Sequence, residues 1–178
     1  AEEQVHSSVS KSLKMRLPWM FFNLLTVTFV AFTVSFFQST IQKFVAITIL
    51  MPVIAGMGGN AGTQSLTVVV RGLALGEIEF KQGLKLLFKQ LRVGFVAGTI
   101  IGIVAGIISY LFFNNPYLGF IGAGALLLNM TLACLIGSVV PLTLRKLHLD
   151  PALGSSIFVT MITDIGGYIF LFGLATIF

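Results

Sequence analysis

Charged residues are scarce in this sequence. Asp, Glu, Lys and Arg together make up 10% of its 178 residues, whereas an average soluble domain carries about 25%. Hydrophobic residues make up 56% of the chain, and the mean hydropathy is +1.00. This composition excludes an ordinary soluble globular domain and predicts an integral membrane protein.

Cysteine and catalytic motifs are also scarce. Because Cys134 is the single cysteine, an internal disulfide is excluded. The sequence has neither HExxH nor CxxC, and no histidine lies at membrane depth to activate Ser155 or Ser156. We therefore expect no enzyme activity. An initiator Met and the residue order of a signal peptide are missing too, so we expect the chain to be part of a longer protein.

Long apolar runs are what the sequence has instead. A helical membrane span needs roughly 20 apolar residues. Only helices or closed barrels satisfy the backbone in hydrocarbon, and these runs lack the alternation of barrel strands. We therefore predict an all-α, multi-pass protein of the plasma or inner membrane with five transmembrane helices. The predicted spans are Leu17–Phe37, Phe44–Leu75, Val93–Phe113, Leu118–Leu144 and Ala152–Phe178.

The basic residues predict how these spans are oriented. They lie before the first span, around the connection between the second and third, and after the fourth, whereas Lys43 lies in an opposite connection. Placing ten of the eleven Lys and Arg residues inside makes the N-terminus cytoplasmic and the C-terminus external. The net charge of +5 thus indicates orientation in lipid, not a nucleic-acid partner. Residues 77–92 show an amphipathic pattern, which predicts a separate connector helix on the cytoplasmic leaflet.

Asp164 is the unusual acid of this chain. Five of the six acids lie in or beside the predicted cytoplasmic segments, but Asp164 lies near the middle of the fifth span. An Asp there costs about 2.5 to 3.5 kcal/mol on insertion scales, and such residues normally mark ion pathways. Ser156 and Thr160 precede it on the same helix face. The alternatives are an Asp hydrogen-bonded or protonated inside the bundle, and hydroxyls that bond back to their own helix.

The second span has an unusual segment from Met51 to Ser65, MPVIAGMGGNAGTQS. Its glycines allow either close helix packing at Gly58 and Gly62 or an opened helix that presents carbonyl groups to water, and packing is favoured. Glycine also recurs at every fourth position of the third span, which predicts a smooth packing face. These four residues are Gly94, Gly98, Gly102 and Gly106.

Taken together, these features resemble the transmembrane domain of the MgtE family of magnesium channels. The matching residues are Arg16–Trp19 before the first span, Met57–Gln64 in the second, and Asp150–Leu153 followed by Asp164 in the fifth. The resemblance covers residues 17–178. It implies a homodimer with five spans per subunit, a pore at the dimer axis between the second and fifth spans, and Mg²⁺ entering the cytoplasm down its electrochemical gradient.

The resemblance also implies site residues and missing partners. Residues 1–16 are expected to be the end of a cytoplasmic plug helix, which joins the 17–178 pore domain to an upstream cytosolic sensor. Asp150, which from the residues alone is an N-cap before Pro151, is expected to help bind a regulatory Mg²⁺. The chain departs from the family at Ser156, Thr160 and Thr63. The expected metal site is Asp164, Thr160, Ser156 and Asp150, and the expected pore-lining residues are Gly58, Gly59, Asn60 and Thr63.

Physical chemistry agrees with a magnesium site at Asp164. Mg²⁺ takes about six oxygens and gives up water reluctantly, so we expect a hydrated ion held by two Asp164 carboxylates through its waters. A divalent ion also removes the repulsion between the two carboxylates. Two other functions remain open: a secondary-active divalent cation transporter coupled to protons or sodium, and a membrane scaffold that transports nothing.

Overall fold

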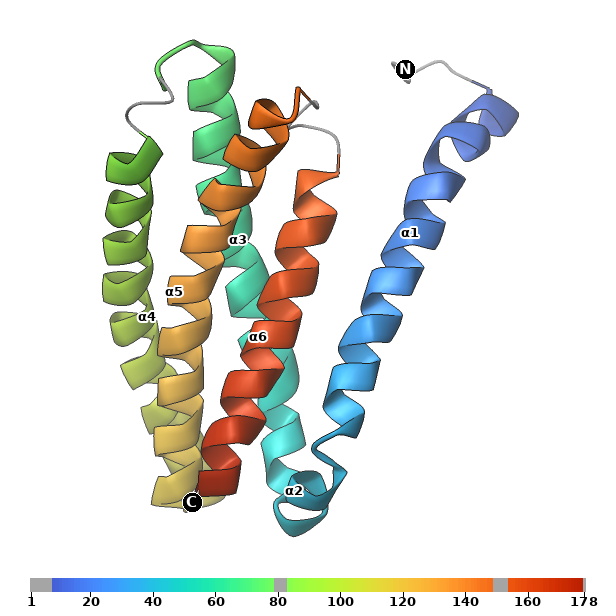
Figure 1. The fold of residues 1–178 in the computed structure, drawn as a ribbon. Helices are drawn as coiled ribbons and strands as arrows, with labels where there is room; N and C mark the ends of the chain where they lie inside the picture. Colours follow the sequence, from blue (N-terminus) through green and yellow to red (C-terminus); the bar gives the residue numbers. More distant parts are fainter. Residues whose placement is uncertain (1–7, 79–82, 149–153, 178) are drawn as a thin grey trace.

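The computed structural model describes residues 8–78, 83–148 and 154–177, and every regular element in these ranges is helical (Figure 1). Five stretches are long and apolar enough to cross a membrane: α1, η1 with α3, α4, α5 and α6. The prediction of an all-α membrane protein with five long apolar helices is therefore confirmed. The elements are α1 (Val9–Ser35), α2 (Gln38–Lys43), the 3-10 helix η1 (Val45–Leu50), α3 (Met51–Ala74), α4 (Gly83–Phe113), α5 (Pro116–Lys146) and α6 (Ser155–Ile177).

Helix α5 forms the centre of the bundle, because it packs against α4 as well as against α3 and α6. Half of its most apolar stretch is buried inside the subunit, against 11% for α1. Helix α1 packs chiefly on α6, which Trp19 and Phe22 contact at Gly154 and Phe158, and its first turns stand away from the other helices (Figure 1). Most of the apolar side chains of α1 are thus left for lipid or another protein surface.

The predicted glycine face of α4 packs directly on the backbone of α5. A Cβ atom added at any of its glycines would lie 2.7 to 2.9 Å from a carbonyl oxygen of α5. Small residues let two membrane helices approach this closely, and van der Waals contact then holds them together. The prediction that this face serves packing is confirmed. The four α4 residues are Gly94, Gly98, Gly102 and Gly106.

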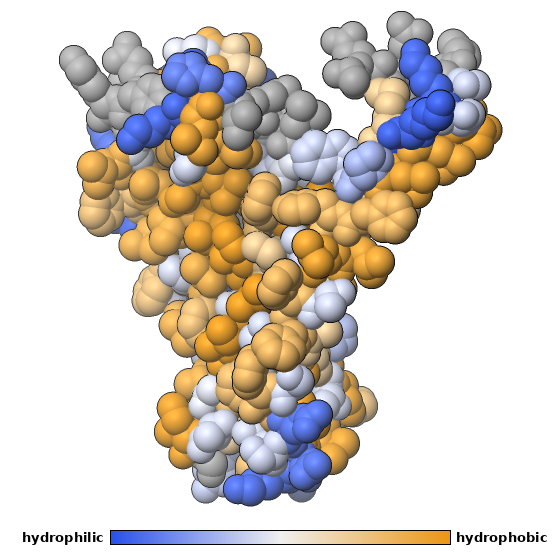
Figure 2. Space-filling view, turned by 45° about the vertical axis from the view of Figure 1, so that its right-hand side comes forward, coloured by the Kyte–Doolittle hydropathy of each residue, from blue (hydrophilic) through white to orange (hydrophobic). Residues whose placement is uncertain are grey.

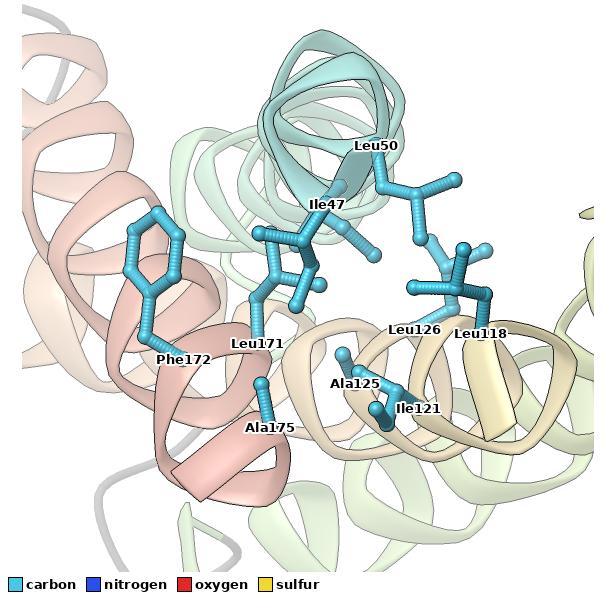
Figure 3. Packing of buried hydrophobic residues seen from close by; sticks show 10 residues of the cluster. Ile47, Leu50, Leu118, Ile121, Ala125, Leu126, Leu171, Phe172 and Ala175 are labelled. Atoms are coloured by element: carbon cyan, nitrogen blue, oxygen red, sulfur yellow. The ribbon is translucent and has the colours of Figure 1, made fainter. Parts of the chain in front are cut away.

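An apolar cluster closes the bundle at the end where α5 begins and α6 finishes (Figure 3). Its side chains come from η1, α3, α5 and α6, so it joins the start of α3 to the end of α6. The rings of Phe37 and Phe172 stack with centroids 5.4 Å apart, and the hydroxyls of Thr40 and Thr176 are 3.0 Å apart. The buried members are Ile47, Leu50, Ile54, Leu118, Ile121, Ala125, Leu126, Leu171, Phe172 and Ala175.

One predicted helix boundary is wrong. Residues 83–92 are not a separate connector helix, because they form the first turns of the 31-residue α4. No proline interrupts this stretch, and Gly94 is held by packing on α5 instead of breaking the helix. Helix α1 begins at Val9 and continues through Pro18, so residues 9–16, where the end of a plug helix was expected, and the first apolar span form one helix. The expected site residue Asp150 and residues 79–82 of the predicted connector lie outside the described residues.

The basic residues of the described chain gather at one end of the bundle, which we call the basic end. There α1, α4 and α6 begin, and α3 and α5 finish (Figure 1). Lys43 of α2 lies at the opposite end. Figure 2 shows hydrophilic residues at both ends and a largely hydrophobic side between them. The basic end carries Lys11, Lys14, Arg16, Arg71, Lys85, Lys89, Arg92, Arg145 and Lys146.

Candidate functional site

Asp164 lies near the middle of the 23-residue α6, and its side chain is half-buried. No hydrogen bond or ion pair reaches its carboxylate from residues 8–78, 83–148 or 154–177. The described length of α6 contains no Lys or Arg that could neutralise it. An unpaired carboxylate at this depth is costly, and either a proton or a cation from outside the subunit would remove that cost.

Ser156 and Thr160 share the column with Asp164, and both are exposed on the subunit surface. The Thr160 hydroxyl donates to the Ser156 carbonyl oxygen at 2.8 Å. This back-bonding, one of the alternatives from the sequence, uses the hydroxyl proton but leaves the oxygen able to accept a hydrogen bond. Thr160 can therefore accept from a water molecule.

A cleft of about 570 Å³ separates the first half of α1 from α6, and the notch at one end of the molecule in Figure 2 is part of this hollow. Ser156 and Thr160 line it on α6, with Arg16 and Asn23 facing them from α1. Asp164 is not among its lining residues. Asn23 was not predicted from the sequence, although it is the single Asn in the apolar run of the first span.

The glycine-rich segment of α3 is an unbroken α-helix, so close packing and not an opened helix explains it. A Cβ at Gly62 would lie 2.7 Å from Val159 Cγ1 on α6. Gly58 is also buried, and a Cβ there would overlap the side chain of Asn129 on α5. A Cβ at Gly59, in contrast, would meet nothing within 4 Å.

The residues expected to line the pore therefore fall on two faces of α3. Asn60 and Thr63 are exposed on the outer surface of the subunit, and Gly59 is partly exposed. Gly58 faces the inside of the subunit. The structure thus brings three polar or open positions of α3 to its outer surface, while the inner glycines hold α3 against α5 and α6.

Asn129 of α5 is a buried polar residue that the sequence analysis missed. Its side chain is fully buried, and Nδ2 donates to the Ile54 carbonyl oxygen at 2.9 Å. Its Oδ1 accepts no hydrogen bond from the described residues. The amide is wedged between Gly58 and Gly167, where a Cβ at Gly167 would lie 2.7 Å from Nδ2. Asn129 therefore fixes the spacing of the two helices that carry the candidate site.

A methyl group at Gly58 is expected to destabilise the protein by about 1 to 3 kcal/mol, because it overpacks the Asn129 amide. Asn129→Ala opens room for that methyl group, so the double variant should be more stable than the sum of the two single changes predicts. Unfolding of all four proteins in mixed detergent measures this coupling. If the stability changes of the two single variants simply add up in the double variant, the Asn129 amide does not limit the space at Gly58.

The described part of one subunit does not hold a cluster of metal ligands. In the described ranges, no group of three or more His, Cys, Asp or Glu residues lies close enough together to hold a metal ion. The described column offers one carboxylate, from Asp164, together with the oxygens of Ser156 and Thr160. Such a set fits an ion that keeps most of its water, or one shared with a second carboxylate donor.

Comparison with known proteins identifies relatives along most of this chain. The profile of the MgtE family, described as divalent cation transporter, matches residues 51–174. "Magnesium transporter MgtE" of Bacillus subtilis is 35% identical over 163 residues, which are 92% of this chain and 36% of the relative. The protein of the same name from Enterococcus faecalis is 32% identical over 176 residues, covering 99% of this chain and 39% of the relative.

A third relative is more distant. "Magnesium transporter MgtE" of Thermus thermophilus is 27% identical over 161 residues, which are 90% of this chain and 35% of the relative. The chain therefore spans little more than a third of the length of these relatives.

Proposed function

Because the chain belongs to the MgtE family of divalent cation transporters, we propose that it forms the membrane pore through which Mg²⁺ enters the cytoplasm. It is a multi-pass protein of the cell membrane, with its five apolar stretches as the spans. The observation that carries the proposal is the half-buried, unpaired carboxylate of Asp164 in the middle of α6.

The pore needs a second copy of the chain, because one subunit supplies one carboxylate at this depth. In a homodimer the outer faces of α3 and α6 meet at the axis, and two Asp164 side chains face the same ion. Their two negative charges match a divalent cation and remove their mutual repulsion when it binds. The hydrated ion binds through its waters, which donate to Asp164 and to the free acceptor positions of Thr160 and Ser156.

The membrane potential determines the direction in which Mg²⁺ moves through the pore. The basic end is placed in the cytoplasm by the positive-inside rule, so the N-terminus is cytoplasmic and the C-terminus external. An inside-negative potential favours inward movement of one charge by about 2.3 kcal/mol per 100 mV, and hence of Mg²⁺ by about 4.6 kcal/mol. This driving force is enough for uptake without a coupled ion.

Regulation is assigned to parts beyond the described helices. The relatives are about two and a half times as long as this chain, which leaves room for an upstream cytosolic sensor. The proposed boundary lies between a connecting segment at residues 1–16, leading from this sensor, and the pore domain at 17–178; of that segment, residues 9–16 are the first turns of α1. Asp150, which lies outside the described residues, is proposed to help bind a regulatory Mg²⁺.

Uptake into proteoliposomes of the purified chain tests this function. With an imposed inside-negative potential and no sodium or proton gradient, we expect Mg²⁺ uptake that rises with the potential, and single-channel currents in planar bilayers. Protein-free liposomes of the same lipid are the control. Uptake that requires a sodium or proton gradient would identify a coupled carrier, and no uptake under any gradient would favour the scaffold.

A further inference from the structure

A second pocket lies on the other flank of α3, away from the Asp164 column. It has a volume of about 330 Å³ and is bounded by α3 and α4, with α5 as its floor. Gln64 lines it from α3, and Lys89 and Gln90 line it from α4. None of Ser156, Thr160 and Asp164 lines it. Of the predicted pore residues, Asn60 is the one that it shares.

Gln90 is the buried polar side chain of this pocket. It is 6% exposed, and it makes no hydrogen bond within the described parts of the chain. Buried amides in proteins almost always have hydrogen-bond partners, because the cost of removing an amide from water is otherwise not offset by a new hydrogen bond. In the described chain, the fully buried side-chain atom without a partner is Asn129 Oδ1, so the Gln90 amide atoms keep some access to the pocket. Its two N–H donors and its carbonyl oxygen can therefore form hydrogen bonds with an occupant of the pocket.

Lys89 gives this pocket its charge. Its ammonium group forms no ion pair with any of the described residues. No Asp or Glu lines the pocket, whereas Lys89, Gln90 and Gln64 all present N–H donors. An ammonium group with neighbouring amide donors is complementary to a phosphate oxygen.

The depth of the pocket matches a lipid headgroup. The apolar part of α4 begins at Val93, so Lys89 lies one turn outside it, at the basic end. Lysines in such a position reach the headgroup level. Below Lys89 the pocket continues along Val93, Ala97 and Met57, which are apolar. A basic pocket between membrane helices with an apolar lower part is suited to a phosphate that carries acyl chains.

We propose that this pocket binds an anionic phospholipid at the basic end of the bundle. Lys89 contacts the phosphodiester, Gln90 and Gln64 donate hydrogen bonds to it, and the acyl chains follow the groove between α3 and α4. The proposal depends on membrane embedding and not on Mg²⁺ transport, so the two can fail separately.

The test is thermal unfolding of the delipidated, purified chain in neutral detergent, titrated with phosphatidylglycerol or phosphatidylcholine. We expect phosphatidylglycerol to raise the unfolding midpoint saturably, and phosphatidylcholine to raise it much less. Lys89→Met and Gln90→Met should lose most of this shift. Lys85→Met is the matched control, since Lys85 is exposed on the same helix but does not line the pocket, and it should keep the shift.

Gln90→Met should lose the stabilisation by lipid and yet not destabilise the lipid-free protein, a combination that a purely structural role of Gln90 does not predict. Without lipid this variant should be at least as stable as the parent, because the mostly buried Gln90 amide has no hydrogen-bond partner among the described residues to lose. Equal shifts with both lipids, or full shifts in Lys89→Met and Gln90→Met, would overturn the proposal. The last titration uses inorganic phosphate. The same rise in the unfolding midpoint with phosphate alone would identify a free-anion site and overturn the assignment to a lipid.

Discussion

Asp164→Asn is expected to reduce Mg²⁺ uptake to the level of protein-free liposomes. Asparagine keeps the shape of the side chain but removes its charge, and in a dimer both charges at the ion path are lost. A charge in the middle of a membrane acts through a low dielectric, so its loss there has a much larger effect than at a wetted surface. The variant should still fold, because the carboxylate has no partner among the described residues.

Two measurements separate loss of the site from loss of the fold. Without Mg²⁺, Asp164→Asn should unfold at the same temperature as the parent or higher, because a half-buried charge has been removed. Addition of Mg²⁺ should stabilise the parent and not the variant.

Asp164→Glu keeps the charge and should retain part of the uptake. Thr99→Val on α4, whose exposed hydroxyl bonds back to Phe95, is the remote control. Parental uptake in Asp164→Asn would rule out this ion path.

Gly98→Ala is expected to destabilise the protein by about 1 to 3 kcal/mol. Alanine normally stabilises a helix relative to glycine by roughly 0.5 to 1 kcal/mol. A loss of stability in Gly98→Ala would therefore indicate a steric clash and not a change in helix propensity. A Cβ at Gly98 would lie 2.9 Å from the carbonyl oxygen and 3.0 Å from the Cα of Leu127. Both atoms are backbone of α5, and no side-chain rotation can move them away.

Gly173→Ala is the matched control for this change. Gly173 also lies inside a helix, α6, but a Cβ there would meet nothing within 4 Å. We expect it to be neutral or slightly stabilising. Detergent unfolding followed by circular dichroism measures both variants against the parent. If the two substitutions shift the midpoint equally, contact between α4 and α5 at Gly98 is not what holds these helices together.

The sequence predicted the helices well because lipid leaves the backbone few choices. Each apolar run had to become a helix, and the glycines of α4 marked its packing face because only small residues allow such close contact. The helix ends were harder to predict. Hydropathy marks where the hydrocarbon ends, but α4 continues through Lys85 and Lys89 because nothing in the backbone stops it there.

The polar site was predicted only where it carries charge. Asp164 was identified because a carboxylate at mid-membrane is expensive. Asn129 and Gln90 are neutral amides, and their positions matter because of which helices meet around them. That information depends on contacts between α3, α4, α5 and α6, which the periodicity of a single helix does not contain. Whether two Asp164 side chains meet likewise depends on a contact between chains.

The first half of α1 contains none of the buried residues of this helix, so a small tilt of the helix moves its start by a larger distance. Its buried residues, Thr26 and Val30, both lie in its second half, and Val34 beyond them packs against the apolar cluster that closes the bundle. The stretch from Val9 to Leu25 is about 25 Å long at the helical rise of roughly 1.5 Å per residue. A tilt of about 5° at Thr26 therefore moves the start of α1 by about 2 Å. Such a tilt changes the width of the cleft beside Ser156 and Thr160. It also moves Trp19 and Phe22 relative to Gly154 and Phe158, which they contact at the start of α6.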